Sequence, residues 1–295
     1  MEFAFQRPGT RLRTILCLML TLSLSSCANL PLQQRGTLGS YAGMAPSGGT
    51  LTKARLRVDP PPVLAAKTVR IVPTSANVGG TSAFNPKDLA LVTNAIDRTL
   101  CTGLSDRFRI VASDQPADLT VHATVTDIVA TNRTAAATST VTSLGASVAL
   151  PVPIPRIPLG LGGLSVEAEA IGQDGSQKAA MLWSRGANVL TTPRYSNVGD
   201  AYSLSSAFGT DFSRMLVKGK DPFKGMPAMP SMQSVRASLG GAPKYVACKA
   251  FGSAPGITGA VAGQLGLPPA WSDKGAAGAN NNNNKPIHRD AVVTQ

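Results

Sequence analysis

Charged and aromatic residues are both scarce in this chain of 295 residues. Asp, Glu, Lys and Arg make up 15% of it, and Phe, Trp and Tyr only 5%. A chain kept disordered by its charge is excluded, because the charged fraction is low while hydrophobic residues reach 43%. The 29 glycines and 22 prolines predict long irregular stretches between the regular elements.

Histidine and the recurring catalytic motifs are nearly absent as well. The two histidines are His122, on the polar face of an expected strand, and His288, in a polar C-terminal tail. The sequence has no GxSxG elbow, no HExxH zinc motif and no P-loop, and the glycines at 160–163 lack the spacing of a dinucleotide fingerprint. We therefore expect a protein that is not an enzyme and that has no cofactor-binding or metal site.

The N-terminus has the three parts of a bacterial lipoprotein signal. Arg7, Arg11 and Arg13 precede the apolar run Thr14–Leu24, whose eleven residues are too few for a stable membrane span but suit a signal peptide. The run ends in Leu24-Ser25-Ser26-Cys27, which resembles a lipobox. The pattern predicts a signal peptide over residues 1–26 and acylation of Cys27, for example with palmitate. The alternative is an ordinary cleavage site beside a chance cysteine.

The residue after the cysteine and the lack of a later span predict where the protein resides. Ala28, rather than Asp, at this position suggests the outer membrane, with the protein facing the periplasm. The best rival for a membrane helix, Val141–Gly163, contains four prolines and Arg156 and is not expected to span a bilayer. The expected membrane partner is therefore lipid, reached through acylated Cys27.

Basic residues outnumber acidic ones, 28 to 16, for a net charge of +12. Residues 1–26 hold three arginines and one glutamate, so the remaining chain has 25 basic and 15 acidic residues. Such a balance attracts nucleic acid, anionic lipid or anionic cell-wall polymer, or is simply a solvated basic surface. An exported protein meets little nucleic acid, so lipid or wall polymer is favoured.

Four cysteines occur, and two of them are already assigned. Cys17 leaves with the signal peptide and Cys27 is the lipidation site. Cys101 and Cys248 remain, and in the oxidising periplasm an even pair predicts a disulfide. The alternative is two buried free thiols.

The rest of the chain divides by composition and periodicity. Residues 27–65 are rich in Gly, Ser, Pro and Gln and predict a flexible tether. Residues 66–218 predict an α+β core domain: a mostly antiparallel sheet of four to five strands with two helices packed on one face, in the order β-α-β-β-(insert)-β-β-α. The strands are expected over 68–73, 108–112, 119–126, 164–170 and 177–189, and the helices begin at Pro86 and at Asp200, which is expected to cap the second one.

Three further segments lie in or after the core. The Pro-rich insert 132–163 is either a cover for the sheet or a docking site for a partner. A C-terminal extension over 219–273 is expected to form short helices, and residues 274–295 a disordered tail.

Two groups of charged residues are candidates for functional sites. Glu167 and Glu169 share one strand face and match a glycosidase acid/base pair, although solvated side chains on a wet face are the commoner case. Arg70, Arg107 and Arg109 form either a basic stripe for an anionic partner or ordinary outward charges. In both groups the second interpretation is favoured, so no catalytic residue is predicted.

Several segments together resemble an uncharacterised proteobacterial lipoprotein family, the domain of unknown function three-three-one-three. They are the lipobox, TVRIVPT at 68–74, GLSDRFRIV at 103–111, ADLTVHATVTDI at 117–128, GLSVEAEA at 163–170 and GDAYSLSSAFGTDFSRML at 199–216. The resemblance implies no activity and no catalytic residues. We expect a non-catalytic binding or accessory component of an envelope complex, with a possible protein partner and no nucleic acid. The alternatives are a hydrolase of cell-wall or lipid polymers and a structural spacer.

Overall fold

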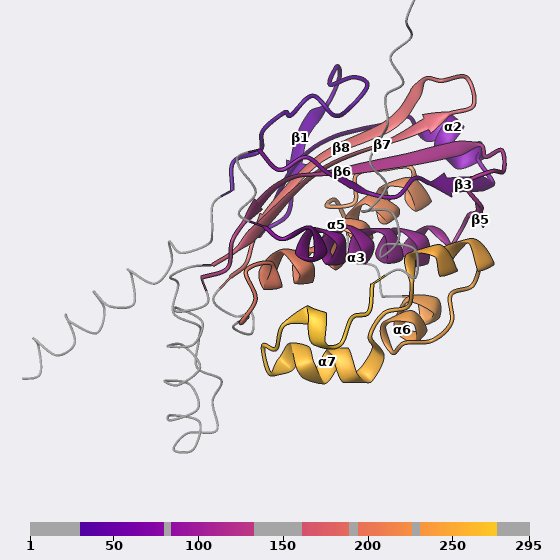
Figure 1. Cartoon of the computed structure of the whole chain (residues 1–295). Helices are drawn as coiled ribbons and strands as arrows, with labels where there is room; N and C mark the ends of the chain where they lie inside the picture. Colours follow the sequence, from indigo (N-terminus) through magenta and orange to yellow (C-terminus); the bar gives the residue numbers. More distant parts are fainter. Residues whose placement is uncertain (1–29, 80–83, 133–160, 189–193, 226–230, 276–295) are drawn as a thin grey trace, which may run out of the picture.

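One mixed sheet organises the protein. The computed structural model describes residues 30–79, 84–132, 161–188, 194–225 and 231–275 (Figure 1). Within them eight strands form a sheet in the order β1-β2-β8-β7-β6-β3-β5, with β4 paired to β6. The strands are β1 (Ala45–Gly48), β2 (Thr52–Val58), β3 (Thr68–Ile71), β4 (Ser75–Ala76), β5 (Arg109–Val111), β6 (Leu119–Val129), β7 (Gly163–Gly172) and β8 (Gln177–Gly186).

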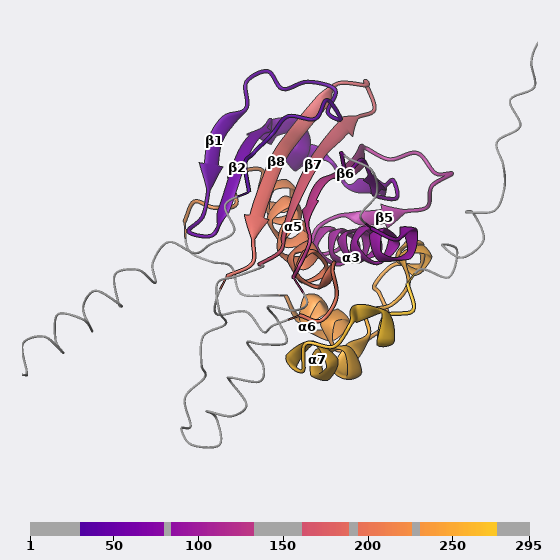
Figure 2. The same cartoon turned by 60° about the vertical axis from the view of Figure 1, so that its left-hand side comes forward.

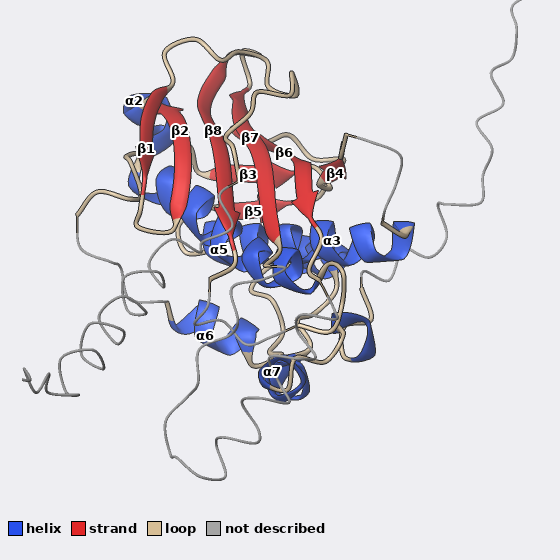
Figure 3. Ribbon diagram, turned by 90° about the vertical axis from the view of Figure 1, so that its left-hand side faces the viewer, coloured by secondary structure: helices blue, strands red, loops and turns tan. Residues whose placement is uncertain are grey.

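Helices cover one face of this sheet, and the C-terminal elements form a further layer outside them. Two long helices, α3 (Pro86–Leu104) and α5 (Gly199–Lys218), pack against each other and against the sheet (Figure 3). The C-terminal elements lie beyond them, on the side away from the sheet (Figures 1 and 3). They are α6 (Met232–Ser238), the 3-10 helix η2 (Val246–Phe251), α7 (Gly256–Gln264) and the 3-10 helix η3 (Pro269–Trp271).

The sheet is antiparallel on one side and parallel on the other. Strands β1, β2, β8, β7 and β6 pair antiparallel, as Figure 2 shows for the long strands, whereas β3 pairs parallel with both β5 and β6. The parallel pair arises because α3 carries the chain from β3 back to the start of β5. A mostly antiparallel α+β sheet is thus confirmed, but the expected strand count and order are wrong.

The missing strands lie in the segment expected to be a tether. Residues 45–58 form β1 and β2, and the short helix α2 (Pro60–Ala65) follows. In β2 the buried Thr52, Ala54 and Leu56 alternate with more exposed residues such as Lys53. This period-2 pattern is present in the sequence, but the inward side chains are mostly small or polar and Gly and Pro flank them. The interpretation of residues 30–65 as a flexible tether is therefore wrong.

Aromatic side chains from β8 and α5 form the centre of the core. Trp183 is fully buried and packs edge-on against Phe208, with ring centroids 5.7 Å apart. Its indole N–H donates a hydrogen bond of 2.9 Å to Asp211. Burial raises the pKa of this Asp211 carboxyl, while the hydrogen bond from Trp183 opposes the rise.

Asp200 joins the two ends of the insert instead of capping its helix. Helix α5 begins one residue earlier, at Gly199, and has no side-chain cap. The Asp200 carboxylate accepts hydrogen bonds from Thr131 Oγ1 (3.0 Å) and from Gly162 N (2.8 Å). Residues 133–160, and with them most of the predicted insert, lie outside the described residues, as do the signal peptide, Cys27 and most of the predicted tail.

None of the helices in the described part of the chain is both long and apolar enough to cross a membrane.

Candidate functional site

The two glutamates of β7 are buried, so the prediction that they are solvated is wrong. The exposed fraction is 1% for Glu167 and 6% for Glu169. Glu167 accepts hydrogen bonds from Arg35 N (2.7 Å), Thr37 N (3.1 Å) and Tyr41 OH (2.6 Å), and a further one from Thr37 Oγ1. The wet strand face expected from the sequence is covered by a segment more than a hundred residues earlier in the chain.

We call this segment, residues 30–44, the N-terminal strap. Its Leu38 and Met44 pack on Ala180 and Leu182 of β8, and so bury the outer face of that strand. Glu169 adds a second attachment, since it accepts hydrogen bonds from Gly39 N (2.9 Å) and from Gln177 Nε2 (2.6 Å). The carboxylate pair therefore fastens the strap, and its acceptor atoms are already used by backbone and side-chain donors.

Tyr41 shows the electrostatic effect of this arrangement. Burial raises the pKa of the Tyr41 hydroxyl, and the hydrogen bond to the Glu167 carboxylate raises it further. The phenol consequently keeps its proton and remains a donor to Glu167.

The other charged candidates do not come together as one site. Arg107 donates to the carbonyl groups of Val63 and Leu64 at the end of α2, so it has a structural partner. Arg70 donates to Thr120 Oγ1 at 3.0 Å on the neighbouring strand, whereas Arg109 is exposed. His122 is half-buried on β6, directly opposite Glu169 in the register, and His288 lies outside the described residues. Arg70 and Arg109 are thus outward positions on neighbouring strands, and Arg107 lies in the turn before β5, apart from the sheet.

A cavity of about 670 Å³ lies between α3, α5 and the C-terminal elements. We call it the helix–extension cavity. Its size is within the usual range for sites that bind small molecules or peptide segments. The α5 side contributes residues that recur three or four positions apart, namely Ser203, Ser206, Thr210, Ser213 and Val217.

The lining of this cavity is largely apolar, and hydroxyl groups are its most frequent polar groups. Three of them already donate their protons to helix carbonyls: Ser203 to Gly199 O, Ser206 to Ser203 O and Thr210 to Ser206 O. Their oxygens keep lone pairs that can accept from a ligand. Ser213, only 2% exposed, has a buried hydroxyl without a hydrogen-bond partner. Arg214 and Lys218 add positive charge, so the lining offers both acceptors and cations.

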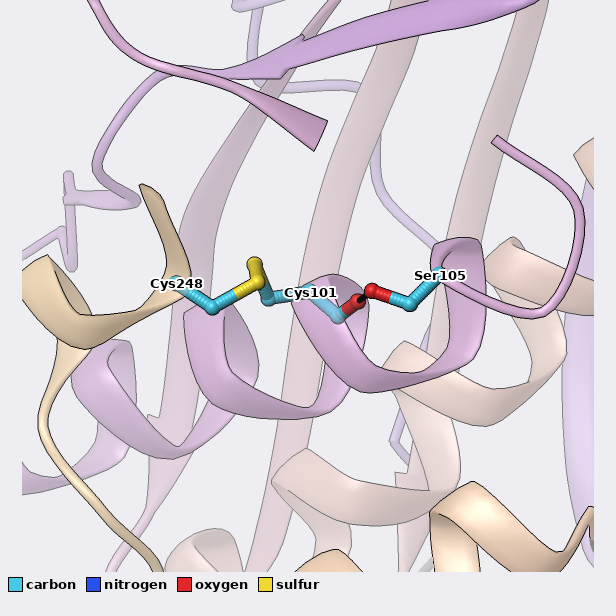
Figure 4. Close-up of a disulfide and its surroundings, with 3 residues drawn as sticks. All are labelled: Cys101, Ser105 and Cys248. Atoms are coloured by element: carbon cyan, nitrogen blue, oxygen red, sulfur yellow. Dashed lines mark hydrogen bonds between the residues drawn. A yellow bond between two sulfur atoms is a disulfide. The ribbon is translucent and has the colours of Figure 1, made fainter. Parts of the chain in front are cut away.

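A disulfide fixes the far wall of the cavity to α3. Cys101 of α3 and Cys248 of η2 are bonded, with their Cα atoms 5.9 Å apart (Figure 4). Both cysteines line the cavity, and Ser105 closes the last turn of α3 by donating to Cys101 O (Figure 4). The disulfide that the cysteine count predicts therefore forms part of the lining of the helix–extension cavity.

Asp273 holds the end of the C-terminal elements against both long helices. It forms a salt bridge with Arg98 of α3 and accepts a hydrogen bond of 2.6 Å from Tyr202 OH of α5. Burial and the adjacent Asp273 carboxylate raise the pKa of Tyr202, so this phenol stays protonated. These contacts, together with the disulfide, attach residues 231–275 to the long helices of the domain.

The cavity was missed at the sequence level, although a signal for it exists. On α5 the apolar residues Leu204, Phe208, Phe212 and Met215 face the core, and hydroxyl residues recur on the opposite side of the same helix. A polar helix face normally indicates contact with water, and only the packing of the C-terminal elements turns it into a cavity wall. Among the described residues, no group of three or more His, Cys, Asp or Glu side chains is placed to hold a metal ion.

Comparisons with known proteins give a family and a distant structural likeness. A family model described as Protein of unknown function (DUF3313) matches residues 33–212. The chain is similar to the PelC dodecamer from Paraburkholderia phytofirmans, with 11% identity, coverage of 58% of this chain and 99% of that chain, and a TM-score of 0.35. A PelC variant from the same organism gives 12% identity, coverage of 57% and 98%, and a TM-score of 0.34. No curated protein matches significantly in sequence. A likeness this distant carries no argument about function or assembly.

Proposed function

The chain belongs to the DUF3313 family of proteins of unknown function, and we propose that it is a lipid-anchored binding protein of the bacterial envelope. In this proposal acylated Cys27 anchors it in the outer membrane and the folded domain faces the periplasm. The domain acts without catalysis, as an accessory component that binds a partner through the helix–extension cavity.

The observation that carries the binding role is the cavity itself. Its volume of about 670 Å³ and its largely apolar lining, which also carries hydroxyl groups and the cations Arg214 and Lys218, suit a partner group with an apolar part and a polar or anionic part. The disulfide and the Asp273 contacts hold its walls in place, which lowers the conformational cost of binding.

The alternative, a hydrolase of cell-wall or lipid polymers, loses its only sequence candidates. The acid/base pair considered for it was Glu167 and Glu169, and both carboxylates are buried beneath the strap. A polymer could reach them only after the strap had left the sheet. The geometry therefore favours binding over hydrolysis.

Lipid anchoring is tested by labelling cells with a radioactive fatty acid. We expect label in the wild-type protein and none in Cys27→Ala, which should accumulate as unprocessed precursor. Label in Cys27→Ala would refute anchoring at this residue, whatever the outcome for the cavity.

Binding in the cavity is tested by site-specific photocrosslinking in intact cells. A benzoylphenylalanine residue at Ser206, an exposed position on the cavity rim, should give a discrete adduct that mass spectrometry can identify. The same residue at Ser176, in the exposed hairpin turn between β7 and β8, is the matched control. The binding role fails if position 206 gives no adduct or only the adducts that position 176 also gives.

A further inference from the structure

Large apolar side chains are exposed over residues 231–275, and from here on we use the name C-terminal extension for this range in place of the predicted 219–273. They are Met232, Val235 and Leu239 at α6, Val246 in η2, Ile257, Val261 and Leu265 at α7, and Trp271 in η3. Elsewhere in the described part of the chain, only Leu64 and Val129 are large apolar residues with comparable exposure. Single exposed apolar residues are common on protein surfaces, but a concentration of them in one region indicates an interaction surface.

The spacing places the side chains of α7 on one side of the helix. Ile257, Val261 and Leu265 recur every four residues, and their exposed fractions are 66%, 54% and 61%. Helix α6 contacts α7, and α7 contacts η3, so the exposed residues belong to neighbouring elements. A helix that packs on its own domain turns its apolar stripe inward, whereas here the stripe faces solvent.

Positive charge accompanies these apolar side chains. Arg236, Lys244, Lys249 and Lys274 are all exposed in the extension. Asp273 is the only acidic residue in the same range, and it is buried in its contacts with Arg98 and Tyr202. The surface therefore combines apolar groups with unneutralised cations, which is the combination that binds an anionic phospholipid surface.

The N-terminal strap brings the domain close to its proposed anchor. Leu30 is 4% exposed and lies against Gly163, at the start of β7. Only Ala28 and Asn29 lie between Cys27 and Leu30, and three extended residue steps reach at most about 11 Å. Because the strap is fastened to the sheet, the chain has none of the slack that a tether over 27–65 would have provided.

The same end of the sheet is linked by contacts to α7. Next to Gly163, the backbone N–H of Gly162 donates to Asp200 in the first turn of α5. Arg194 lies against Gly199 of that turn and donates to Gly263 O of α7 at 2.6 Å. The backbone N–H of Tyr195 donates to Gly266 O at 2.9 Å, just after α7. The end of the sheet nearest Cys27 is therefore continuous with the extension.

We propose that the C-terminal extension is a membrane-binding surface, on which α7 and Trp271 contact an anionic phospholipid bilayer. Its placement rests on the proposed anchoring at Cys27, but the affinity for lipid resides in the extension itself. The acyl chains and the extension together hold the domain flat on the membrane, with the helix–extension cavity beside the headgroups. A soluble partner would not require cations and apolar groups so close to the lipid anchor.

The test uses the chain that starts at Ala28, which has no acyl group and keeps every described residue. Vesicles of phosphatidylethanolamine and phosphatidylglycerol serve as the probe, and vesicles of phosphatidylcholine alone as the neutral comparison. The protein has two tryptophans, and Trp183 is fully buried whereas Trp271 is 68% exposed. A blue shift of the fluorescence on binding therefore reports Trp271, and co-sedimentation measures the bound fraction.

We expect the protein to bind the anionic vesicles, with the blue shift, and to bind more weakly in high salt. Replacing Ile257, Val261 and Leu265 together by Asn should weaken vesicle binding by about tenfold or more, because three apolar side chains no longer enter the interface. Leu64→Asn is the matched control, since this exposed leucine lies on α2, outside the extension, and should leave binding unchanged.

Three results would overturn the proposal. One is the absence of binding to anionic vesicles, and another is binding that the triple variant retains in full. The third is a blue shift that appears without vesicles as the protein concentration rises, together with a larger mass in sedimentation, because the surface would then bind a second copy. None of these outcomes bears on acylation of Cys27, which the fatty-acid labelling tests separately.

Discussion

Replacing Glu167 by Ala should release the N-terminal strap from the sheet. The carboxylate of this residue accepts hydrogen bonds from Arg35 N, Thr37 N and Oγ1, and Tyr41 OH. Hydrogen bonds to a charged group contribute about 1.5–3 kcal/mol each, but they are not additive within one cluster. Deleting this carboxylate leaves neutral donors without an acceptor, at about 1–3 kcal/mol for each donor that stays buried, so we expect a loss of about 3 kcal/mol in the free energy of unfolding.

The assay combines denaturant unfolding with hydrogen exchange of single amides. In Glu167→Ala the amides of Arg35, Thr37 and Gly39 should exchange much faster than in the wild type, while those of β7 and β8 keep most of their protection. Glu167→Gln is the matched control, because it keeps the shape and one acceptor oxygen, and it should lose only about 1–2 kcal/mol. The reasoning is refuted if Glu167→Ala stays within about 1 kcal/mol of the wild type and the three amides stay protected.

Three further perturbations test the core, the extension and the helix packing. Burial raises the pKa of Asp97 to about 7, against hydrogen bonds from Thr74, so the folded protein holds this proton more tightly than the unfolded chain. Its contribution to stability is present below about pH 4 and is lost as the pH rises to about 7, a change of about 4 kcal/mol in the free energy of unfolding. Urea unfolding at several pH values should show this pH dependence in the wild type and not in Asp97→Asn. Identical pH profiles for the two proteins would contradict this. Replacing Cys101 and Cys248 by Ser removes a disulfide between residues 147 positions apart. Because the unfolded chain gains conformational entropy, the free energy of unfolding should fall by at most about 5 kcal/mol. Amides of η2 and α7 should then exchange before those of β7, and uniform loss of protection would count against a local role. Gly209→Ala brings a Cβ to 2.7 Å from Thr99 Cβ, so we expect a loss of about 1–3 kcal/mol in thermal unfolding, whereas Ser206→Ala on the exposed side of the same helix should change little.

The elements with strong periodicity were predictable from the chain alone. Asn85 caps α3 through a hydrogen bond to Lys87 N, with Pro86 in the first turn, as the sequence indicates. The alternation in β6 and the Asp174-Gly175 turn between β7 and β8 were also recognisable, because each depends on neighbours within a few residues. The disulfide partners followed from counting cysteines, since the predicted signal peptide and lipidation site take Cys17 and Cys27 and leave only two.

The candidate site was not predictable to the same extent. Glu167 and Glu169 alternate with apolar residues, which indicates a wet face, and nothing local reveals that residues 30–44 return to cover it. The hydroxyls of α5 likewise form an ordinary polar face until η2 and α7 are placed over them. In both cases the burial of a polar side chain depends on a segment far away in the sequence.

The sequence by itself determined the long helices, the strands with clear alternation and the pairing of Cys101 with Cys248, because each is a local pattern or a matter of counting. Only the tertiary structure decided that a Gly- and Pro-rich N-terminal segment is two strands and a strap, and that the strap shortens the reach from Cys27 to the domain. It also decided which apolar side chains of the C-terminal extension remain exposed to solvent. The physical reason is that hydrogen-bond partners for buried carboxylates, and cover for apolar faces, come from whichever segments the whole fold brings together.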